Sequence, residues 1–154
     1  MITGQLGALL EELGQALSIP NLQPDSNETC LLRVQNGIEV QIELDRRQNA
    51  LIVGVDLGEL PLGRFREDVF EAALKANNDT KNPYGFFAYS QQKEHLILFD
   101  RLDLHELNGI KIADFLTPFS EKAKFWKDSI ANNQVPQGEG SSGGIKRGIF
   151  GLTP

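Results

Sequence analysis

The strongest constraint on the fold is a stretch of seven residues, 38–44, in which apolar and polar side chains alternate without exception. Its apolar members are Ile38, Val40, Ile42 and Leu44, and its polar members are Glu39, Gln41 and Glu43. Because successive side chains of a strand point to opposite faces, this pattern predicts an antiparallel strand with one buried and one wet face. The dipeptide Asn36-Gly37 just before it favours a type I′ turn, in which both central residues adopt a positive φ. The sequence therefore predicts a hairpin that pairs residues 29–35 with residues 38–44.

Three more strands are predicted after this hairpin. Residues 50–55 are apolar at nearly every position, which indicates a central strand or one that is covered on both faces. Residues 84–90 are aromatic and strand-like, and residues 96–102 follow after a polar turn. Strands that are joined by short turns must be antiparallel, so the sequence predicts a five-stranded antiparallel sheet.

Three helices are predicted around this sheet. The opening segment has leucines at spacings of three and four, which places them on one helix face: Leu6, Leu9, Leu10, Leu13 and Leu17. A second helix is expected over residues 63–77 and a third over residues 110–132. Pro118 leaves two alternatives for the third: it restarts a helix after Thr117, or it kinks one continuous helix.

The predicted fold is thus α+β, with the order α-β-β-β-α-β-β-α and the helices on one side of the sheet. Residues 1–132 form its single domain, and residues 133–154 form a tail. Residues 136–144 are rich in glycine and serine, which predicts a flexible linker. The tail ends in a short basic and apolar segment, 145–152.

Charge and composition exclude several classes of partner. The formal net charge of −6 opposes binding to nucleic acid, and no apolar run approaches the length of about 18 residues that spans a bilayer. The first basic residue is Arg33, so the basic start of a secretory signal is missing. Cys30 is the single cysteine and has no internal disulfide partner. We therefore expect a cytoplasmic protein that neither enters a membrane nor binds nucleic acid.

No group of residues predicts a catalytic, metal or cofactor site. The residues Asp100, Asp103, His105 and Glu106 form the one cluster with metal-ligand chemistry, but a solvated turn is the favoured interpretation. His95 lacks a nucleophile in a suitable setting, and Cys30 is expected to be a small buried residue. The glycines 138, 140 and 143 match a dinucleotide-binding pattern only formally, because no strand and helix flank them. We expect no cofactor and no enzymatic activity.

Apolar residues on both faces of two predicted strands are harder to explain. The second face of residues 50–55 carries Ala50, Ile52 and Gly54, and residues 84–90 place aromatic side chains on both faces. With helices on only one side, something else must cover these residues. A dimer partner, a bound polypeptide or long loops of the same chain are the alternatives.

The order of elements, the size and the acidity resemble the class I chaperones of type III secretion, the CesT/SycE-like effector chaperones. The resemblance covers residues 1 to about 132. It is carried by the opening helix LGALLEELGQALSIP, the strands CLLRVQNGIEVQIEL and LIVGVDLGELP, the helix EDVFEAALKANN and the segment FLTPFSEKAKFWKDSI. The family does not require the tail, and Pro118 departs from its usual unbroken last helix.

The resemblance implies a homodimer that binds the N-terminal segment of an effector in extended form and keeps it soluble and competent for secretion. A secretion ATPase or the export apparatus would be a further partner. By this resemblance we expect effector contacts at Leu6, Leu10, Leu31, Val34 and Ile52. We expect the dimer interface at Phe65, Val69, Tyr84 and Phe86.

The tail supports a second hypothesis. A basic apolar segment on a linker would suit an adaptor that binds folded partners of a secretion apparatus. It would also suit a segment that folds back and occupies the binding groove of its own chain.

Overall fold

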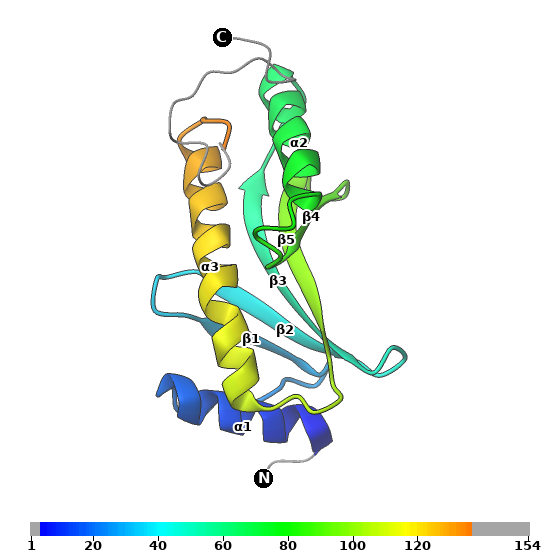
Figure 1. The fold of residues 1–154 in the computed structure, drawn as a ribbon, viewed down its shortest axis with the longest axis vertical. Coiled ribbons are helices and arrows are strands. Elements are labelled where there is room, and N and C mark those ends of the chain that lie inside the picture. The colour runs from blue at the N-terminus through cyan, green and yellow to red at the C-terminus, as the bar shows by residue number, and fades with distance from the viewer. Residues whose placement is uncertain (1–3, 137–154) are drawn as a thin grey trace.

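The computed structural model of the protein describes residues 4–136 as one antiparallel sheet of five strands with three helices (Figure 1). The helices are α1 (Gly4–Leu17), α2 (Arg64–Asn77) and α3 (Gly109–Ala131). The strands are β1 (Thr29–Arg33), β2 (Glu39–Asp45), β3 (Ala50–Glu59), β4 (Phe86–Ser90) and β5 (His95–Asp103), in the spatial order β1-β2-β3-β5-β4. The predicted α+β class and element order are confirmed. The glycine pattern and the basic segment of the tail lie outside the described residues.

The predicted hairpin between the first two strands forms, but with a different turn. The Val34 N–H donates to the Ile38 carbonyl, and the Gly37 N–H donates to the Val34 carbonyl, both at 2.9 Å. Gly37 has a φ of 90°, whereas Asn36 is not among the residues with positive φ. The type I′ prediction is therefore wrong, because three residues rather than two connect the strands. The Asn36 side chain instead accepts from the Ile38 N–H and donates to the Ser120 carbonyl of α3, each at 3.1 Å.

The central strand β3 is four residues longer than residues 50–55, over which it is predicted. β3 continues through Gly58 by means of a β-bulge, which shifts its register with β5 between Asp56 and Gly58. The Asp56 carboxylate accepts from the Gly58 N–H at 2.9 Å and holds the bulge in place. As a result, β3 pairs with β5 along most of its length and carries side chains of the site described below.

The last helix is continuous through Pro118, so the alternative of a helix restart at this proline is wrong. The helix begins instead at Asn108, whose side chain accepts from the Lys111 N–H at 2.8 Å, as an N-cap does. Pro118 has no N–H to donate within the helix. Tertiary packing compensates for this loss, since the neighbouring Leu116 and Phe119 are buried in the core.

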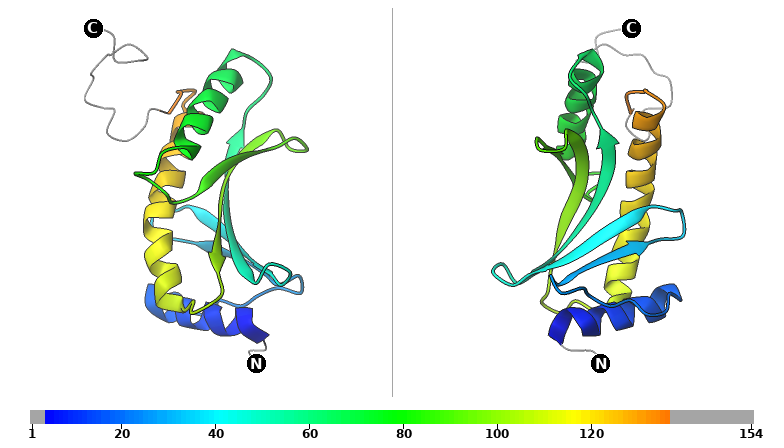
Figure 2. Two further views of the ribbon diagram at one scale, coloured as in Figure 1. Left: turned by 45° about the vertical axis from the view of Figure 1, so that its right-hand side comes forward. Right: turned by 180° about the vertical axis from the view of Figure 1, so that it is seen from behind.

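All three helices lie on the same side of the twisted sheet (Figures 1 and 2). α3 runs along this side, with α1 beside its beginning and α2 beside its end. The side chains between sheet and helices form one apolar core; its largest fully buried members are Leu10, Leu13, Leu32, Ile42, Leu51, Leu57, Leu60, Leu96, Leu98, Ile112, Leu116 and Phe119. Within residues 4–136, no helix combines the length and the apolar character that crossing a bilayer demands.

Candidate binding face of the sheet

The side of the sheet that faces away from the helices carries side chains from all five strands, and no helix of the described chain covers it (Figure 2). We call this side the open face. By the alternation of the strands it comprises Thr29, Leu31, Arg33, Glu39, Gln41, Glu43, Ile52, Gly54, Asp56, Phe86, Ala88, Ile97, Phe99 and Arg101. The opposite side chains of the same strands form the core, so each strand separates the two environments residue by residue.

One row of cross-strand neighbours crosses the whole open face. Its members, in spatial order, are Leu31, Gln41, Gly54, Phe99 and Phe86. Leu31 is 63% exposed, Phe86 45% and Phe99 36%, and the two phenyl rings lie 6.4 Å apart between centroids. Gly54 adds no side chain, which leaves a hollow in the middle of the row. Since the single chain leaves these apolar groups in water, the row is a candidate contact surface.

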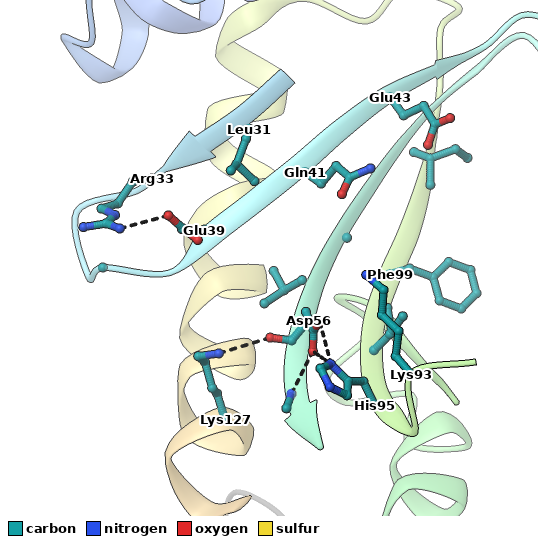
Figure 3. Close-up of a pocket in the computed structure, with 16 residues that line it drawn as sticks. Leu31, Arg33, Glu39, Gln41, Glu43, Asp56, Lys93, His95, Phe99 and Lys127 are labelled. Carbon is teal, nitrogen blue, oxygen red and sulfur yellow. Dashed lines mark hydrogen bonds and ion pairs between the residues drawn. The ribbon is translucent and has the colours of Figure 1, made fainter. Parts of the chain in front are cut away.

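An open groove of about 740 Å³ follows the open face over β1, β2, β3 and β5 (Figure 3). The half-buried side chains of Ile52 and Ile97 line it together with every member of the central row except Phe86. Gln41 and Glu43 add polar groups on the side of β2. A wide groove with an apolar centre and scattered polar groups suits a polypeptide better than a small molecule, whose sites are enclosed.

Ion pairs border the apolar part of the groove. Arg33 of β1 and Glu39 of β2 are cross-strand neighbours whose side chains meet at 2.9 Å. Both side chains are more than half exposed, so solvent screens the pair and its contribution to stability is small. Lys93, just before β5, and Lys127 of α3 lie at the other end of the groove (Figure 3). The border can therefore offer both signs of charge to a bound chain.

The side chains of Asp56 and His95 form a close hydrogen-bonded pair at this border. The Nδ1 atom of His95 lies 2.7 Å from one carboxylate oxygen of Asp56 and 2.8 Å from the other. The Lys127 ammonium donates to the Asp56 carbonyl at 3.3 Å. Partial burial raises the pKa of Asp56. The hydrogen bonds from His95 and the Gly58 N–H and the charges of His95 and Lys127 outweigh this effect, so the pKa lies below its ordinary value.

The outer edge of β1 is unpaired along part of its length. The Val34 N–H and the Glu28 carbonyl bond toward β2, so the backbone groups of the alternate residues Thr29, Leu31 and Arg33 point outward. At Thr29 the edge is closed by Asp25, whose N–H donates to the Thr29 carbonyl at 2.8 Å. Among residues 4–136, no strand pairs beyond β1. Leu31 and Arg33 therefore present backbone groups to which another chain can bond.

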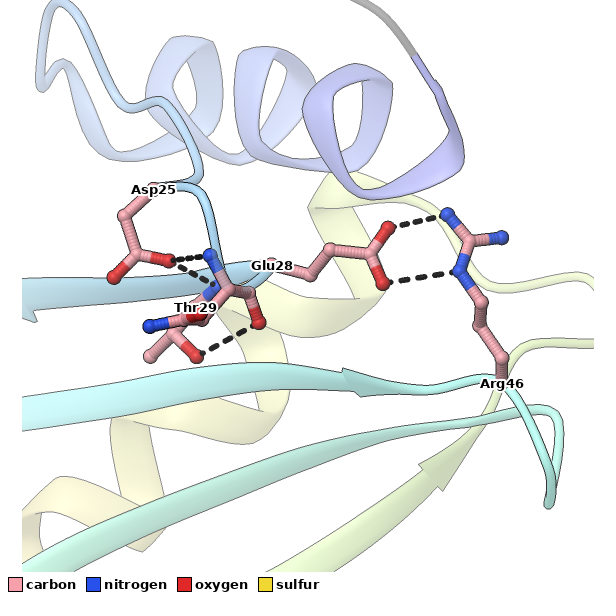
Figure 4. Close-up of polar contacts among 5 residues, drawn as sticks. Asp25, Glu28, Thr29 and Arg46 are labelled. Carbon is pink, nitrogen blue, oxygen red and sulfur yellow. Dashed lines mark hydrogen bonds and ion pairs between the residues drawn. The ribbon is translucent and has the colours of Figure 1, made fainter.

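Side chains fix the start of this edge strand (Figure 4). The Asp25 carboxylate accepts from the N–H groups of Asn27, at 2.8 Å, and Thr29, at 3.0 Å. Both oxygens of Glu28 accept from the Arg46 guanidinium, which follows β2, and the hydrogen bond from Arg46 is the main cause that lowers the pKa of Glu28. These contacts hold the entry of β1 in position, so its open edge is preformed.

The structure separates the five residues for which effector contacts are predicted. Leu31 and Ile52 both line the groove of the open face. Leu6 and Leu10 of α1 are buried in the core of the single chain, at 3% and 1% exposure, so a bound chain could reach them only if α1 moved. Val34 is half-buried against the core just after β1. The contacts themselves stay predictions, of which Leu31 and Ile52 are the two accessible on the open face.

The four residues predicted for a dimer interface do not form one patch within a single chain. Val69 of α2 is fully buried against the core, and Phe65 is half-buried beside it. Tyr84 lies before β4, with its ring 5.8 Å from that of Phe115 in α3. Phe86 lies on the other side of the sheet, in the central row. The interface stays a prediction, and Phe86 is the most accessible of the four.

Sequence reasoning missed part of the open face. Phe99 and Ile97 lie on β5, where the core face is also apolar through Leu96 and Leu98. The same signal that marked residues 50–55, apolar side chains on both faces of one strand, was present there. The pair of Asp56 and His95 carried no local signal, because 39 residues separate its members in the sequence.

The residues considered for metal or nucleophilic chemistry have structural roles. Asp100 accepts from the N–H groups of Gly85 and Arg101, and Asp103 accepts from the His105 N–H. Over residues 4–136, no three metal-ligating side chains gather into one cluster. Cys30 is buried in β1 as predicted; burial, and then the charge of Asp25, raise the pKa of its thiol.

Solved structures with a similar fold are known. One is a chain of the HopA1–SchA chaperone–effector complex, with 14% sequence identity, a TM-score of 0.63 and coverage of 78% of this chain and 91% of that chain. Another belongs to the complex of the Yersinia pestis type III secretion chaperone SycH with a fragment of YscM2, with 19% identity, a TM-score of 0.59 and coverage of 78% and 98%. A third belongs to the ExoT–SpcS complex of Pseudomonas aeruginosa, with 18% identity, a TM-score of 0.59 and coverage of 79% and 97%.

Sequence comparison gives a narrower assignment. No curated protein sequence matches the chain significantly. The sequence profile of the Tir chaperone protein (CesT) family, however, matches residues 8–127, which extend from within α1 to within α3. The profile match covers more than half of the chain, and the chain belongs to the Tir chaperone protein (CesT) family.

Proposed function

We propose that the protein is a chaperone that binds the N-terminal chaperone-binding segment of a type III secretion effector in extended form and keeps it soluble and competent for secretion. Its family is a family of chaperones. Similar folds occur in complexes that are described as chaperone with effector and as type III secretion chaperone with a bound fragment. These relations support the proposal at the level of the fold.

The observation that carries the proposal is the apolar row of the open face beside the unpaired edge of β1. An added strand would bond to the outward backbone groups of Leu31 and Arg33. Alternate side chains of that strand would point to the open face, next to the exposed Leu31. From there the bound segment would continue over the hollow at Gly54 toward Phe99 and Phe86. Backbone bonds would give affinity for many sequences, and the row would select apolar side chains.

The energetics favour a long contact with many small contributions. Ordering an unfolded segment costs about 1–2 kcal/mol per residue, so a few contacts cannot hold it. Burial of apolar surface offsets this cost at about 25 cal/mol per Å², together with new backbone hydrogen bonds along β1. The net charge of −6 keeps such an apolar surface in solution.

The proposed function is binding without a chemical step. The titratable groups of the groove, Asp56 and His95 first among them, pair with each other and hold the β-bulge. We place this function in the bacterial cytoplasm, where effectors await export, with a secretion ATPase or the export apparatus as the next partner.

We further propose that the working form is a homodimer. Two leucines near α2 are strongly exposed in the single chain: Leu62, just before the helix, at 81% and Leu74, within it, at 67%. A second copy would cover such side chains, as large obligate interfaces do. A dimer also doubles the length of surface along which one effector segment can be held.

The charge substitution Leu31→Asp tests the proposed site. The probe is a panel of N-terminal segments of type III effectors, each produced together with the protein and recovered by affinity purification. Because a bound chain would bury Leu31, the substitution should cost about 1.5–3 kcal/mol, or roughly 10- to 150-fold in affinity for the captured segment.

The matched control is Ile110→Asp. Ile110 is 66% exposed, close to Leu31, and lies in the first turn of α3, where an acidic residue is tolerated. This variant should bind as the unchanged protein does. Equal losses in the two variants, or no loss in either, would contradict the proposed site, and capture of none of the segments would contradict the proposed function itself.

A further inference from the structure

The end of α3 directs the chain back toward α2. The Gln134 N–H donates to the Ser129 carbonyl at 2.8 Å, and the Asn133 N–H donates to the Ile130 carbonyl at 3.0 Å. Asn133 has a φ of 57°. These features define a Schellman motif, which ends a helix and reverses the chain. The residues that follow, Val135 and Pro136, line a groove together with residues of α2.

This second groove, which we call the α2 groove, has a volume of about 500 Å³. Its lining residues are Asp68, Glu71, Ala72, Lys75, Ala76, Asp79, Trp126, Val135 and Pro136. Val135 packs against the core, and Pro136 is buried. The described part of the chain therefore ends at this groove.

The charge of the α2 groove is negative. Three acidic side chains, Asp68, Glu71 and Asp79, and one basic side chain, Lys75, line it. Arg64 lies 3.6 Å from Asp68, so Glu71 and Asp79 are the acidic groups left for a basic segment. The groove of the open face differs, because its three acidic side chains are balanced by Arg33, Lys93 and Lys127. A basic segment would therefore be attracted to the α2 groove and not to the open face.

The same chain supplies such a segment. Residues 145–152, with the sequence IKRGIFGL, contain two basic residues, no acidic residue and four large apolar residues. The eight residues between Pro136 and this segment are Gly/Ser-rich. A linker of this length and composition has a mean end-to-end distance of about 16 Å. The groove extends over roughly the same distance, since Asp68 and Asp79 are eleven residues apart along α2 and its end, or about 17 Å at helical rise.

We propose that residues 145–152 dock in the α2 groove of their own chain. Lys146 and Arg147 would pair with Glu71 and Asp79, and the apolar side chains would cover Ala72 and Ala76. The short linker gives the segment an effective concentration on the order of millimolar, so weak contacts suffice. This interaction lies away from the open face and is independent of the proposed effector binding.

Limited trypsin digestion of the full chain tests this docking, because trypsin cleaves after Lys146 and Arg147. The rate at which these two cuts appear is followed by intact mass. In the double variant Glu71→Gln/Asp79→Asn, the cuts should appear roughly fivefold or more faster at low salt, since two charge pairs are lost. The control variant Glu67→Gln/Glu121→Gln changes the net charge equally on exposed helix positions outside the groove, and its rate should stay unchanged.

The unchanged protein gives a second measure that requires no substitution. Salt screens the charge pairs, so both cuts should become faster as the ionic strength is raised. This increase in rate should exceed that for a free peptide with the sequence of residues 145–152, which has no groove to dock in. Equal rates in the two double variants, or the same salt response as the peptide, would overturn the proposal. A cleavage rate that falls as the protein is concentrated would show docking in a second copy and would overturn docking within one chain.

Discussion

At the scale of single residues, Asp56 is the carboxylate of the open face that depends most on its neighbours. Its pKa lies below the ordinary value, so the folded state binds its proton less readily than the unfolded chain does. Its contribution to stability is therefore complete above the unfolded pKa of about 3.9 and is lost as the pH falls through the folded value. The bulge at Gly58 and the contact with His95 would loosen together in acid.

The substitution Asp56→Asn should flatten the acid side of the stability profile. Because asparagine does not titrate, the free energy of unfolding of the variant should fall less steeply below about pH 4 than that of the unchanged protein. Chemical denaturation at a series of pH values measures this slope. The exposed Asp114→Asn on α3 serves as the comparison, and parallel profiles for Asp56→Asn and the unchanged protein would contradict the role assigned to Asp56.

The sequence correctly predicted the burial of single residues where a local pattern alone determines which face of the sheet a side chain occupies. The alternation in β2 correctly separated buried from exposed positions. The leucine spacing of α1 could not show whether Leu6 and Leu10 are buried in the single chain, because a leucine stripe on a helix is the same whether it packs against its own chain or against a partner. Only the tertiary contact of α1 with α3 decides between the two.

At the scale of elements, the packing of α1 on α3 depends on Gly109. A Cβ atom at this position would lie 2.4 Å from the Glu12 carbonyl carbon and 2.5 Å from the Leu13 nitrogen. The Gly109 N–H also donates to the Glu12 side chain at 2.9 Å. The absence of a side chain thus lets the first turn of α3 approach the backbone of α1 and donate to the Glu12 carboxylate.

The substitution Gly109→Ala should lower the free energy of unfolding by about 1–3 kcal/mol, because the added methyl group overpacks a backbone contact. Thermal and chemical denaturation measure the loss. Gly54→Ala is the matched control: its Cβ would meet only the Leu98 carbonyl, at an ordinary 3.7 Å, and its stability should change by less than about 0.5 kcal/mol. Equal effects in the two variants would contradict the close approach.

Element ends were the part of the fold that the sequence left undecided. Gly58 is a strong breaker in isolation, yet the pairing of β3 with β5 carries the strand across it as a bulge. Pro118 is a helix breaker, yet buried neighbours hold α3 continuous around it. In both cases long-range packing overrides a local preference, and no local pattern could show it.

At the scale of the whole molecule, the predicted order of helices and strands along the chain is confirmed. The sequence also indicates which consecutive strands pair, because strands joined by a short turn must be antiparallel neighbours. The second neighbour of β3 was not predicted: β5, and not β4, pairs with it, and α2 separates β3 from both strands, so no short turn indicates the pairing. The exposed groups that follow from this order, the edge of β1 and the row of the open face, are where partners would bind.

The proposed homodimer predicts a solution mass of twice 17.1 kDa. Light scattering at several micromolar concentrations measures this mass. A dimer that persists on dilution would agree with an interface in which a second copy covers the exposed Leu62 and Leu74. The double substitution Leu62→Asp/Leu74→Asp should shift the mass toward the monomer, and a monomeric unchanged protein at all concentrations would contradict the proposed dimer.

The central claim, that an effector segment adds to the edge of β1 and crosses the open face, is tested most directly by amide hydrogen exchange of the protein with and without a captured segment. We expect slower exchange at Leu31 and Arg33, whose N–H groups point outward in the single chain and would be bonded in the complex. The amides of α1 should keep their exchange rates. Unchanged exchange along β1 in a saturated complex, with new protection confined to α1 or α2, would contradict the account.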